Sequence, residues 1–250
     1  MDDRETLWGV IGGTGLTAIE ALDVDETWMP ETPWGEPSAP LRLGRLGGQR
    51  VAFLARHGDP HRIPPHRVNY RANIDALRQA GVDRVIAVNA VGAIHPAMTP
   101  ASLVLPDQLI DYTWGRAPSF YEDNLAHPVH VDFTWPYSEP VRKALQVAAA
   151  ARGVVLHEEG VYACTQGPRL ETAAEIRRLE RDGADIVGMT AMPEALLARE
   201  AELDYACLAL VVNWAAGKTS DVITMDDIRA NLDAGIDQVL QVLEACLSPA

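Results

Sequence analysis

The sequence has few cysteines and no long hydrophobic run. Its 250 residues include 3 cysteines, Cys164, Cys207 and Cys246, which lie far apart and form no CxxC pattern. An odd number of widely spaced cysteines argues against a disulfide framework and against a zinc site, and it favours a reducing compartment such as the cytoplasm. No run of about 18 apolar residues is present, so we expect no membrane-spanning helix.

Basic residues are also scarce. Lys and Arg number 21 against 35 Asp and Glu, which gives a formal net charge of −14 at pH 7. A field of this sign repels nucleic acids and anionic membranes, because both are bound through clustered basic side chains. The opening MDDRETLWGVIGG is acidic where a secretion signal needs basic residues. We therefore expect a cytoplasmic protein that binds neither nucleic acid nor membrane, and any anionic ligand needs a local positive pocket.

The apolar runs and the helix signals alternate as in an α/β protein. Apolar residues make up 48% of the chain, and short runs predict strands at 8–11, 85–88, 103–110, 161–164, 184–188 and 205–212. Residues 41–54 predict a hairpin that turns at Gly47-Gly48 and whose second strand is 51–54. Flanking residues and spacing predict helices at 69–80, 139–152, 171–183 and 224–247. The chain has no internal repeat and no linker, and its length suits one large α/β domain over residues 1–250.

Small polar or glycine-rich groups follow several of these strands. They include Thr14 in the turn GGTG, Arg56-His57, Asn89-Ala90, Met189-Thr190 and Asn213. Ligands in α/β sheets bind outside the carboxyl ends of strands, so we expect these groups to meet in one crevice. The GGTG turn alone is equally typical of a plain strand-to-helix connection, and without GxGxxG spacing it does not predict a dinucleotide site.

Two loops stand out by composition. The segment 59–73 is rich in His, Arg and Pro, and its spacing matches no zinc pattern. Its charge is either simply solvated, or Arg56 and His57 just before it bind an anion. Residues 114–138 lack periodicity and are rich in aromatics and prolines. Such a long loop is usually functional or pinned by a partner subunit.

The motifs together resemble one family over roughly residues 8–247. In chain order they are IGGTG, RHG, VNYRANI, VNAVGAI, TQGPRLET, DIVGMTAMPE and VVNWAAG. They are similar to the trimeric purine nucleoside phosphorylases, and within these to the branch that acts on methylthio-nucleosides. The resemblance implies a single α/β domain whose mixed, partly barrel-like central sheet is flanked by helices. It also implies phosphorolysis of a nucleoside, a homotrimer, inorganic phosphate as co-substrate, and no metal or organic cofactor.

The same resemblance assigns roles to individual residues. Phosphate binding falls to Thr14, Arg56, His57, Asn89, Ala90 and Thr190. Nucleoside contacts fall to Val91, Gly92, Leu170, Glu171, Met189, Asn213 and Ala215. Catalysis involves His57, Glu171 and Asn213, and no activated Ser or Cys is needed because phosphate is the nucleophile. Without the resemblance, Met189 is better interpreted as a core side chain and Glu171 as a helix-dipole partner.

The base pocket departs from the adenine-specific pattern. Methylthioadenosine phosphorylases place an aspartate at the position of Asn213 and a small hydroxyl residue at that of Glu171. Glu171 can accept a hydrogen bond from N1–H of a 6-oxopurine, and Asn213 can donate to O6 and share a proton with N7. Each mispaired buried polar group costs about 1–3 kcal/mol. These two positions therefore predict selection of a 6-oxopurine over a 6-aminopurine.

The sugar pocket follows the methylthio pattern instead. Ordinary nucleoside phosphorylases supply a histidine to the 5′-hydroxyl, but no histidine follows His157 here. The equivalent segment offers Val222, Ile223, Met225 and Ile228, of which Met225 and Ile228 are the specificity candidates. We expect release of hypoxanthine and methylthioribose 1-phosphate from a 6-oxopurine methylthio-nucleoside. The alternatives are an inosine/guanosine phosphorylase, a methylthioadenosine phosphorylase and a non-catalytic nucleoside-binding regulator.

Overall fold

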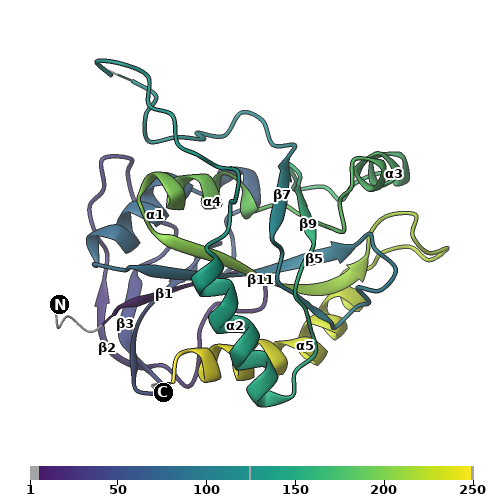
Figure 1. Cartoon of the computed structure of the whole chain (residues 1–250), viewed down its shortest axis with the longest axis horizontal. Helices are drawn as coiled ribbons and strands as arrows, with labels where there is room; N and C mark the ends of the chain where they lie inside the picture. The colour runs from purple at the N-terminus through teal and green to yellow at the C-terminus, as the bar shows by residue number, and fades with distance from the viewer. Residues whose placement is uncertain (1–5, 124, 249–250) are drawn as a thin grey trace.

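Two long strands run side by side and parallel through the middle of the molecule (Figure 1). The structure is a computed structural model that describes residues 6–123 and 125–248, so the ends of the expected 1–250 domain lie outside it. Its sheet has 11 strands: β1 (Trp8–Gly12), β2 (Asp23–Trp28), β3 (Leu41–Leu46), β4 (Gln49–Ala55), β5 (Arg84–Ala93), β6 (Leu103–Val104), β7 (Gln108–Asp111), β8 (Leu156–His157), β9 (Val161–Cys164), β10 (Ile186–Gly188) and β11 (Asp204–Trp214).

The sheet forks along β5. Its first half pairs in parallel with β1, and further along the strand Gly92 and Ala93 pair antiparallel with β10. Beyond these partners the order is β2-β3-β4-β1-β5-β10-β9-β7, and β11 pairs with β5 and leads to β6 and β8. Parallel and antiparallel pairs are therefore mixed, as expected. β1 and β10 thus occupy successive stretches of one edge of β5, and β11 runs along the other edge.

Helices cover the sheet on both sides. They are α1 (Tyr70–Gln79), α2 (Glu139–Arg152), α3 (Ala173–Arg181), α4 (Ala191–Glu200) and α5 (Met225–Cys246), with a 3₁₀ turn η1 (Pro65–Arg67). In the view of Figure 1, α1 and α4 lie above β1 and β11, and α2 and α5 lie in front of and below them. Residues of β1 are all buried, as expected of a strand covered on both faces. The α/β fold with a mixed sheet flanked by helices is thus confirmed.

Several boundaries differ from the sequence-based expectation. The run 103–110 splits into β6 and β7 around Pro106, which has no N–H to continue a ladder. Strand β2 was not expected, because its sequence DVDETW is acidic. In the structure this strand is almost entirely exposed. Helix α3 begins at Ala173, since Thr172 and Glu175 form a capping box, and Glu171 precedes the helix rather than starting it. Strands β5 and β11 continue to Ala93 and Trp214, so their polar groups lie within strands.

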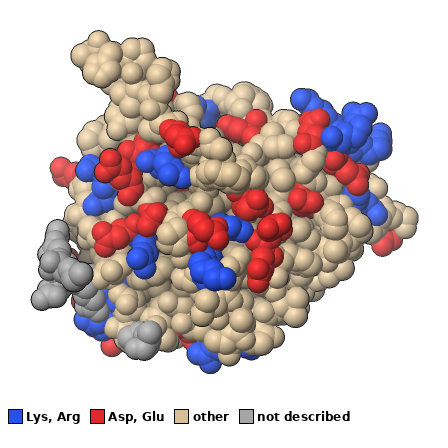
Figure 2. All heavy atoms as spheres, viewed as in Figure 1, with Lys and Arg blue, Asp and Glu red and all other residues tan. Residues whose placement is uncertain are grey.

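Charge on the surface is mixed. Acidic and basic side chains are interspersed over the face in Figure 2, and basic side chains gather over α3 at the upper right. In and beside α3, Arg169 pairs with Glu175 and Arg178 pairs with Asp182. Within the described residues, no helix is long and apolar enough to cross a membrane.

Candidate active site

A cavity of about 250 Å³ lies beside the fork of the sheet. Its wall contains all but two of the candidate residues, namely Thr14, Arg56, His57, Ala90, Val91, Gly92, Leu170, Glu171, Met189, Thr190, Asn213, Met225 and Ile228. Asn89 is buried behind the wall, where it contacts Thr190. Ala215 is buried in a small apolar cluster with Ile94. The groups that follow or end separate strands therefore meet in one crevice.

Arg56 provides a permanent positive charge at one end of the cavity. Its Nε and Nη2 atoms donate to the two carboxylate oxygens of Glu194, at 2.6 and 2.8 Å, and both side chains are fully buried. Tyr205 donates a further hydrogen bond to Glu194 at 2.8 Å. Burial disfavours the charged guanidinium, but the nearby carboxylate outweighs this, and the pKa of Arg56 lies above its ordinary value.

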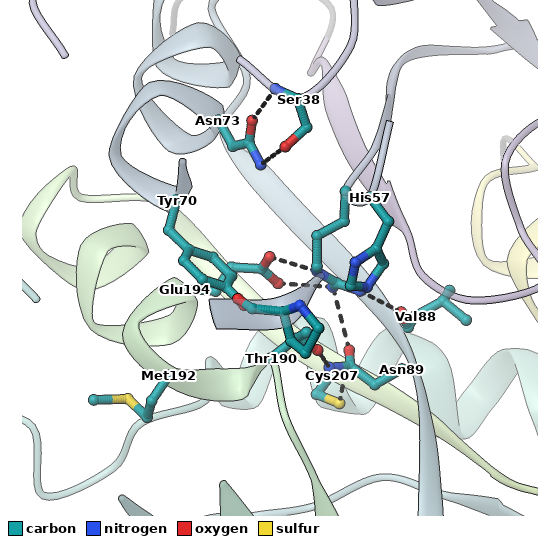
Figure 3. Close-up of polar contacts among 12 residues, drawn as sticks. Ser38, His57, Tyr70, Asn73, Val88, Asn89, Thr190, Met192, Glu194 and Cys207 are labelled. Carbon is teal, nitrogen blue, oxygen red and sulfur yellow. Dashed lines mark hydrogen bonds and ion pairs between the residues drawn. The ribbon is translucent and has the colours of Figure 1, made fainter. Parts of the chain in front are cut away.

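The other N–H groups of Arg56 are on Nη1 and Nη2, and only some of them have a partner within the protein. One Nη1 hydrogen goes to the Val88 carbonyl at 2.9 Å. Figure 3 shows Glu194, Val88 and Asn89 near His57, with Thr190 joined to Asn89 by a hydrogen bond. When the Asn89 amide is oriented to satisfy both its ends, its nitrogen donates to the carbonyls of Ala87 and Val88 and its oxygen accepts from Thr190. Of the five N–H groups of Arg56, two are then left for an anion.

His57 is a neutral, oriented imidazole. Its Nδ1 lies 2.8 Å from the Ile63 carbonyl oxygen, which can only accept, so Nδ1 carries the proton. Burial and the nearby Arg56 charge lower its pKa from 6.5 to about 4. The ring also stacks on His61, with centroids 4.5 Å apart. At neutral pH, Nε2 of His57 is therefore unprotonated and accepts hydrogen bonds.

The glycine turn after β1 lies close over Arg56. A Cβ on Gly13 would lie 2.4 Å from the Val88 carbonyl oxygen and 2.9 Å from Nη1 of Arg56. No larger residue fits there, so glycine is required for the close approach of the turn to the arginine. Thr14, the residue after Gly13, lines the cavity.

Glu171 forms part of the cavity wall. The Thr165 hydroxyl donates to its Oε1 at 2.6 Å, which leaves Oε2 without a partner among the described residues. Leu170 and Pro168 line the cavity next to it. A carboxylate held in this way presents a hydrogen-bond acceptor to the cavity.

Asn213 reaches the cavity because β11 is bulged. Val211 pairs with Val91 but Asn213 pairs with Gly92, so Val212 is the extra residue. A bulge re-aims side chains, and here Val212 and Asn213 both line the cavity. The amide nitrogen donates to the Trp214 carbonyl at 2.7 Å, and a Cβ on Gly92 would lie 3.2 Å from it. One N–H and the amide oxygen remain for a ligand.

The rest of the wall is largely apolar. Met189, Met225 and Ile228 line it. Met225, the first residue of α5, is 58% exposed, whereas Ile228 in the same turn is buried. Val222 is 82% exposed and does not take part. His61 also lines the cavity, so this region contains a polar group in addition to the expected apolar ones.

Some residues of the site were not expected from the sequence. Glu194 was seen only as part of the motif DIVGMTAMPE, without a role. A signal was present, because a glutamate inside the apolar run AMPEALLA needs a partner when buried. Thr165 and His61 were also given no role, although Thr165 begins the motif TQGPRLET and His61 lies in the segment rich in His, Arg and Pro.

No metal site stands out in this region. Among the residues that the structure describes, no three His, Cys, Asp or Glu side chains lie close enough to hold a metal ion. The three cysteines are free, and Cys164 and Cys207 are buried. Burial raises the pKa of Cys164 to about 12, so it is a thiol at neutral pH.

Comparison with known proteins defines the class. The phosphorylase superfamily matches residues 8–248, and the chain belongs to this family. Its backbone superimposes with a TM-score of 0.94 on methylthioadenosine phosphorylase from Schistosoma mansoni in complex with adenine, at 31% identity, covering 97% of this chain and 91% of that one.

Two relatives are more similar in sequence. The chain is 57% identical over 243 residues to a probable S-methyl-5′-thioinosine phosphorylase from Pseudomonas syringae pv. tomato, covering 97% of this chain and 99% of the relative. It is 44% identical over 243 residues to a 6-oxopurine nucleoside phosphorylase from Pyrococcus furiosus, covering 95% of this chain and 91% of that protein.

Proposed function

We propose that the protein catalyses phosphorolysis of S-methyl-5′-thioinosine, which yields hypoxanthine and S-methyl-5-thioribose 1-phosphate. The observation that carries this proposal is the shared cavity wall: the carboxylate of Glu171 and the amide of Asn213 lie in the same cavity as Arg56 and Thr190. One end suits a phosphate dianion, and the other suits the N1–H and O6 edge of a 6-oxopurine.

Phosphate is recognised by the cationic end. The two free N–H groups of Arg56, the Thr14 hydroxyl and the backbone N–H of Ala90 donate to its oxygens, and Thr190, whose hydroxyl proton goes to Asn89, lines the same cavity. Neutral His57 accepts through Nε2 from a hydroxyl of the phosphate or of the ribose. The reaction needs no metal or organic cofactor in this scheme, since phosphate is itself the co-substrate.

The chemistry is a substitution at the anomeric carbon. A phosphate oxygen bonds to C1′ while the C1′–N9 bond breaks, and the electron pair of that bond goes to the purine. The ribosyl group carries positive charge in the transition state, and the bound phosphate stabilises it electrostatically. As the bond breaks, N7 of the purine takes up a proton from solvent. The Asn213 amide donates to O6 and accepts from this N7–H, so the purine leaves as a neutral base. Glu171 accepts from N1–H and holds the base in register.

The apolar wall near α5 suits the methylthio group. Met225 and Ile228 offer carbon and sulfur surface, and each buried methylene is worth about 0.8 kcal/mol. The 57% identical relative carries the name of this activity, which supports the assignment. We also propose that the protein is a cytoplasmic homotrimer.

A second candidate is a general 6-oxopurine nucleoside phosphorylase. His61 lines the cavity, and its imidazole could serve a 5′-hydroxyl. The 44% identical relative bears that name. Inosine is therefore the competitor to methylthioinosine.

The decisive experiment compares kcat/KM for methylthioinosine, inosine and methylthioadenosine with phosphate, with the released base measured by chromatography. We expect the order methylthioinosine, inosine, methylthioadenosine, and no base release without phosphate. Preference for inosine supports the second candidate, and preference for methylthioadenosine refutes the base-pocket argument. Nucleoside binding without base release would make the protein a binding module.

A further inference from the structure

Thr165 holds Glu171 from the side opposite the cavity. It follows β9 directly, and its backbone N–H donates to the Gly188 carbonyl at 2.8 Å. Its hydroxyl lies 2.6 Å from Oε1 of Glu171. Thr165 does not line the nucleoside cavity, but it lines a neighbouring pocket of about 270 Å³ in which Glu171 also takes part. Glu171 therefore lies between the cavity and this neighbouring pocket, and Thr165 forms its hydrogen bond to Glu171 from the side of the pocket.

The direction of this hydrogen bond follows from the distances. The Thr165 hydroxyl has one proton and two acceptors in reach, Glu171 Oε1 at 2.6 Å and the Gly188 carbonyl at 3.4 Å. The shorter contact takes the proton. A bond to an ionised carboxylate is stronger than one between neutral groups. Glu171 is thus held by one oxygen while the other remains for a ligand.

The backbone of Thr165 is itself fixed. Arg116 donates through Nη2 to the carbonyls of Gln166 at 2.9 Å and Thr165 at 3.3 Å. Its Nη1 donates to the Met192 carbonyl at the start of α4. Arg116 thereby ties the end of β9 to the helix that carries Glu194. The donor that holds Glu171 cannot drift without breaking these bonds.

We propose that Thr165 is a positioning residue that sets base selectivity by keeping Glu171 turned toward the base; this rests on the proposed function. An aminopurine presents the N1 lone pair to Glu171, so two acceptors face each other. A free carboxylate relieves this repulsion by rotating into the neighbouring pocket. With Thr165 holding one oxygen, Glu171 cannot turn away, and the aminopurine meets the full repulsion.

The test is a pair of variants, Thr165→Val and Thr165→Ser. Valine keeps the shape and removes the donor, whereas serine keeps the hydroxyl. For Thr165→Val we expect kcat/KM for methylthioinosine to fall about tenfold or more, since a hydrogen bond to a charged group contributes about 1.5–3 kcal/mol. The value for methylthioadenosine should stay constant or rise. Thr165→Ser should keep the wild-type ratio, and KM for phosphate should not change in either variant.

An equal loss for both nucleosides in Thr165→Val, or the same loss in Thr165→Ser, overturns the proposal. A crystal structure of Thr165→Val gives a readout that does not depend on the substrate: the Glu171 carboxylate should leave its position for the neighbouring pocket, and an unmoved carboxylate overturns the proposal. If Thr165→Val does not fold, Thr165→Ala serves the same comparison. A wild-type enzyme that prefers the aminopurine refutes the proposed function, whatever the crystal structure shows.

Discussion

Arg56 and Glu194 lie 138 residues apart in the chain, yet their side chains form a bidentate ion pair that is wholly buried. This pair connects the end of β4 to α4. Removing one member of a buried pair leaves an uncompensated charge, which typically costs about 3–5 kcal/mol. In the proposed reaction, the charge of Arg56 is available to phosphate because the Glu194 carboxylate offsets the cost of burying it.

We therefore expect Glu194→Gln to lower the free energy of unfolding by about 3–5 kcal/mol without phosphate. Saturating phosphate should restore part of this loss, because the dianion becomes the counterion of Arg56. Urea denaturation with and without phosphate measures both effects. The control is Glu122→Gln, which breaks the more exposed pair with Arg71 and should cost at most about 1 kcal/mol. Equal losses in the two variants would contradict the interpretation.

The buried His57 makes stability depend on pH. Its folded-state pKa of about 4 lies below the ordinary 6.5, so the unfolded chain binds more protons between these values. Stability should decrease as pH falls through this window and be unaffected by His57 above it. Between pH 7.5 and pH 5 the contribution is about 2 kcal/mol.

The measurement is the free energy of unfolding of the wild type and of His57→Gln at pH 7.5 and pH 5. The wild type should lose about 2 kcal/mol more than the variant over this interval. Identical losses would mean that His57 is not held neutral in the folded protein.

Asn213 should decide between the two classes of purine. Asn213→Asp replaces the group that donates to O6 by an acceptor, which suits a 6-amino group. We expect kcat/KM for methylthioinosine to fall by about 10- to 100-fold, in line with one mispaired buried contact, and that for methylthioadenosine to rise. KM for phosphate is the internal control. An unchanged ratio between the two nucleosides would show that Asn213 does not read position 6.

Ile228 should favour the methylthio group over a hydroxyl. Ile228→Thr keeps the branched shape, removes apolar surface and adds a hydroxyl. We expect the ratio of kcat/KM for methylthioinosine to that for inosine to fall about fivefold, on the scale of one or two buried methylenes. The same two assays in Val222→Thr give the control, since Val222 is exposed and outside the cavity wall. If this kcat/KM ratio falls equally in both variants, Ile228 does not contact the 5′ substituent of the sugar.

Gly188 is required by the close packing behind the cavity. A Cβ at this position would lie 2.0 Å from the hydroxyl oxygen of the buried Tyr162. Gly188→Ala should therefore destabilise the protein by about 1–3 kcal/mol and lower activity, because the strand or the tyrosine must move. Thermal unfolding compares it with Gly160→Ala, where the nearest atom is the flexible end of Met98 at 3.1 Å. A smaller loss in Gly188→Ala than in Gly160→Ala would contradict this expectation.

Much of the fold was predictable because its signals are local. The buried strand β1, the hairpin of β3 and β4, and helices α1, α2 and α5 follow from apolar spacing and from turn or capping residues within a few positions. The groups at the strand ends were predictable for the same reason. Parallel strands deliver their carboxyl ends to one edge, so a local pattern predicted a shared crevice.

Other features depend on contacts between distant segments. The bulge that aims Asn213 arises from the pairing of β11 with β5, and the fork of the sheet arises from β1 and β10 sharing one edge of β5. Neither the bulge nor the fork can be predicted from the local sequence of these strands. The acidic strand β2 forms because β3 offers it an edge, although its own sequence favours exposure.

The sequence by itself determined which chemical groups the site contains: an arginine, hydroxyls, a carboxylate and an amide, each at the end of a predictable element. Only the tertiary structure decided how these groups are held, through Glu194 behind Arg56, the Ile63 carbonyl on His57 and Thr165 behind Glu171. The physical reason is that residue type sets what a side chain can donate or accept, whereas burial and partners from elsewhere in the chain set its charge and direction.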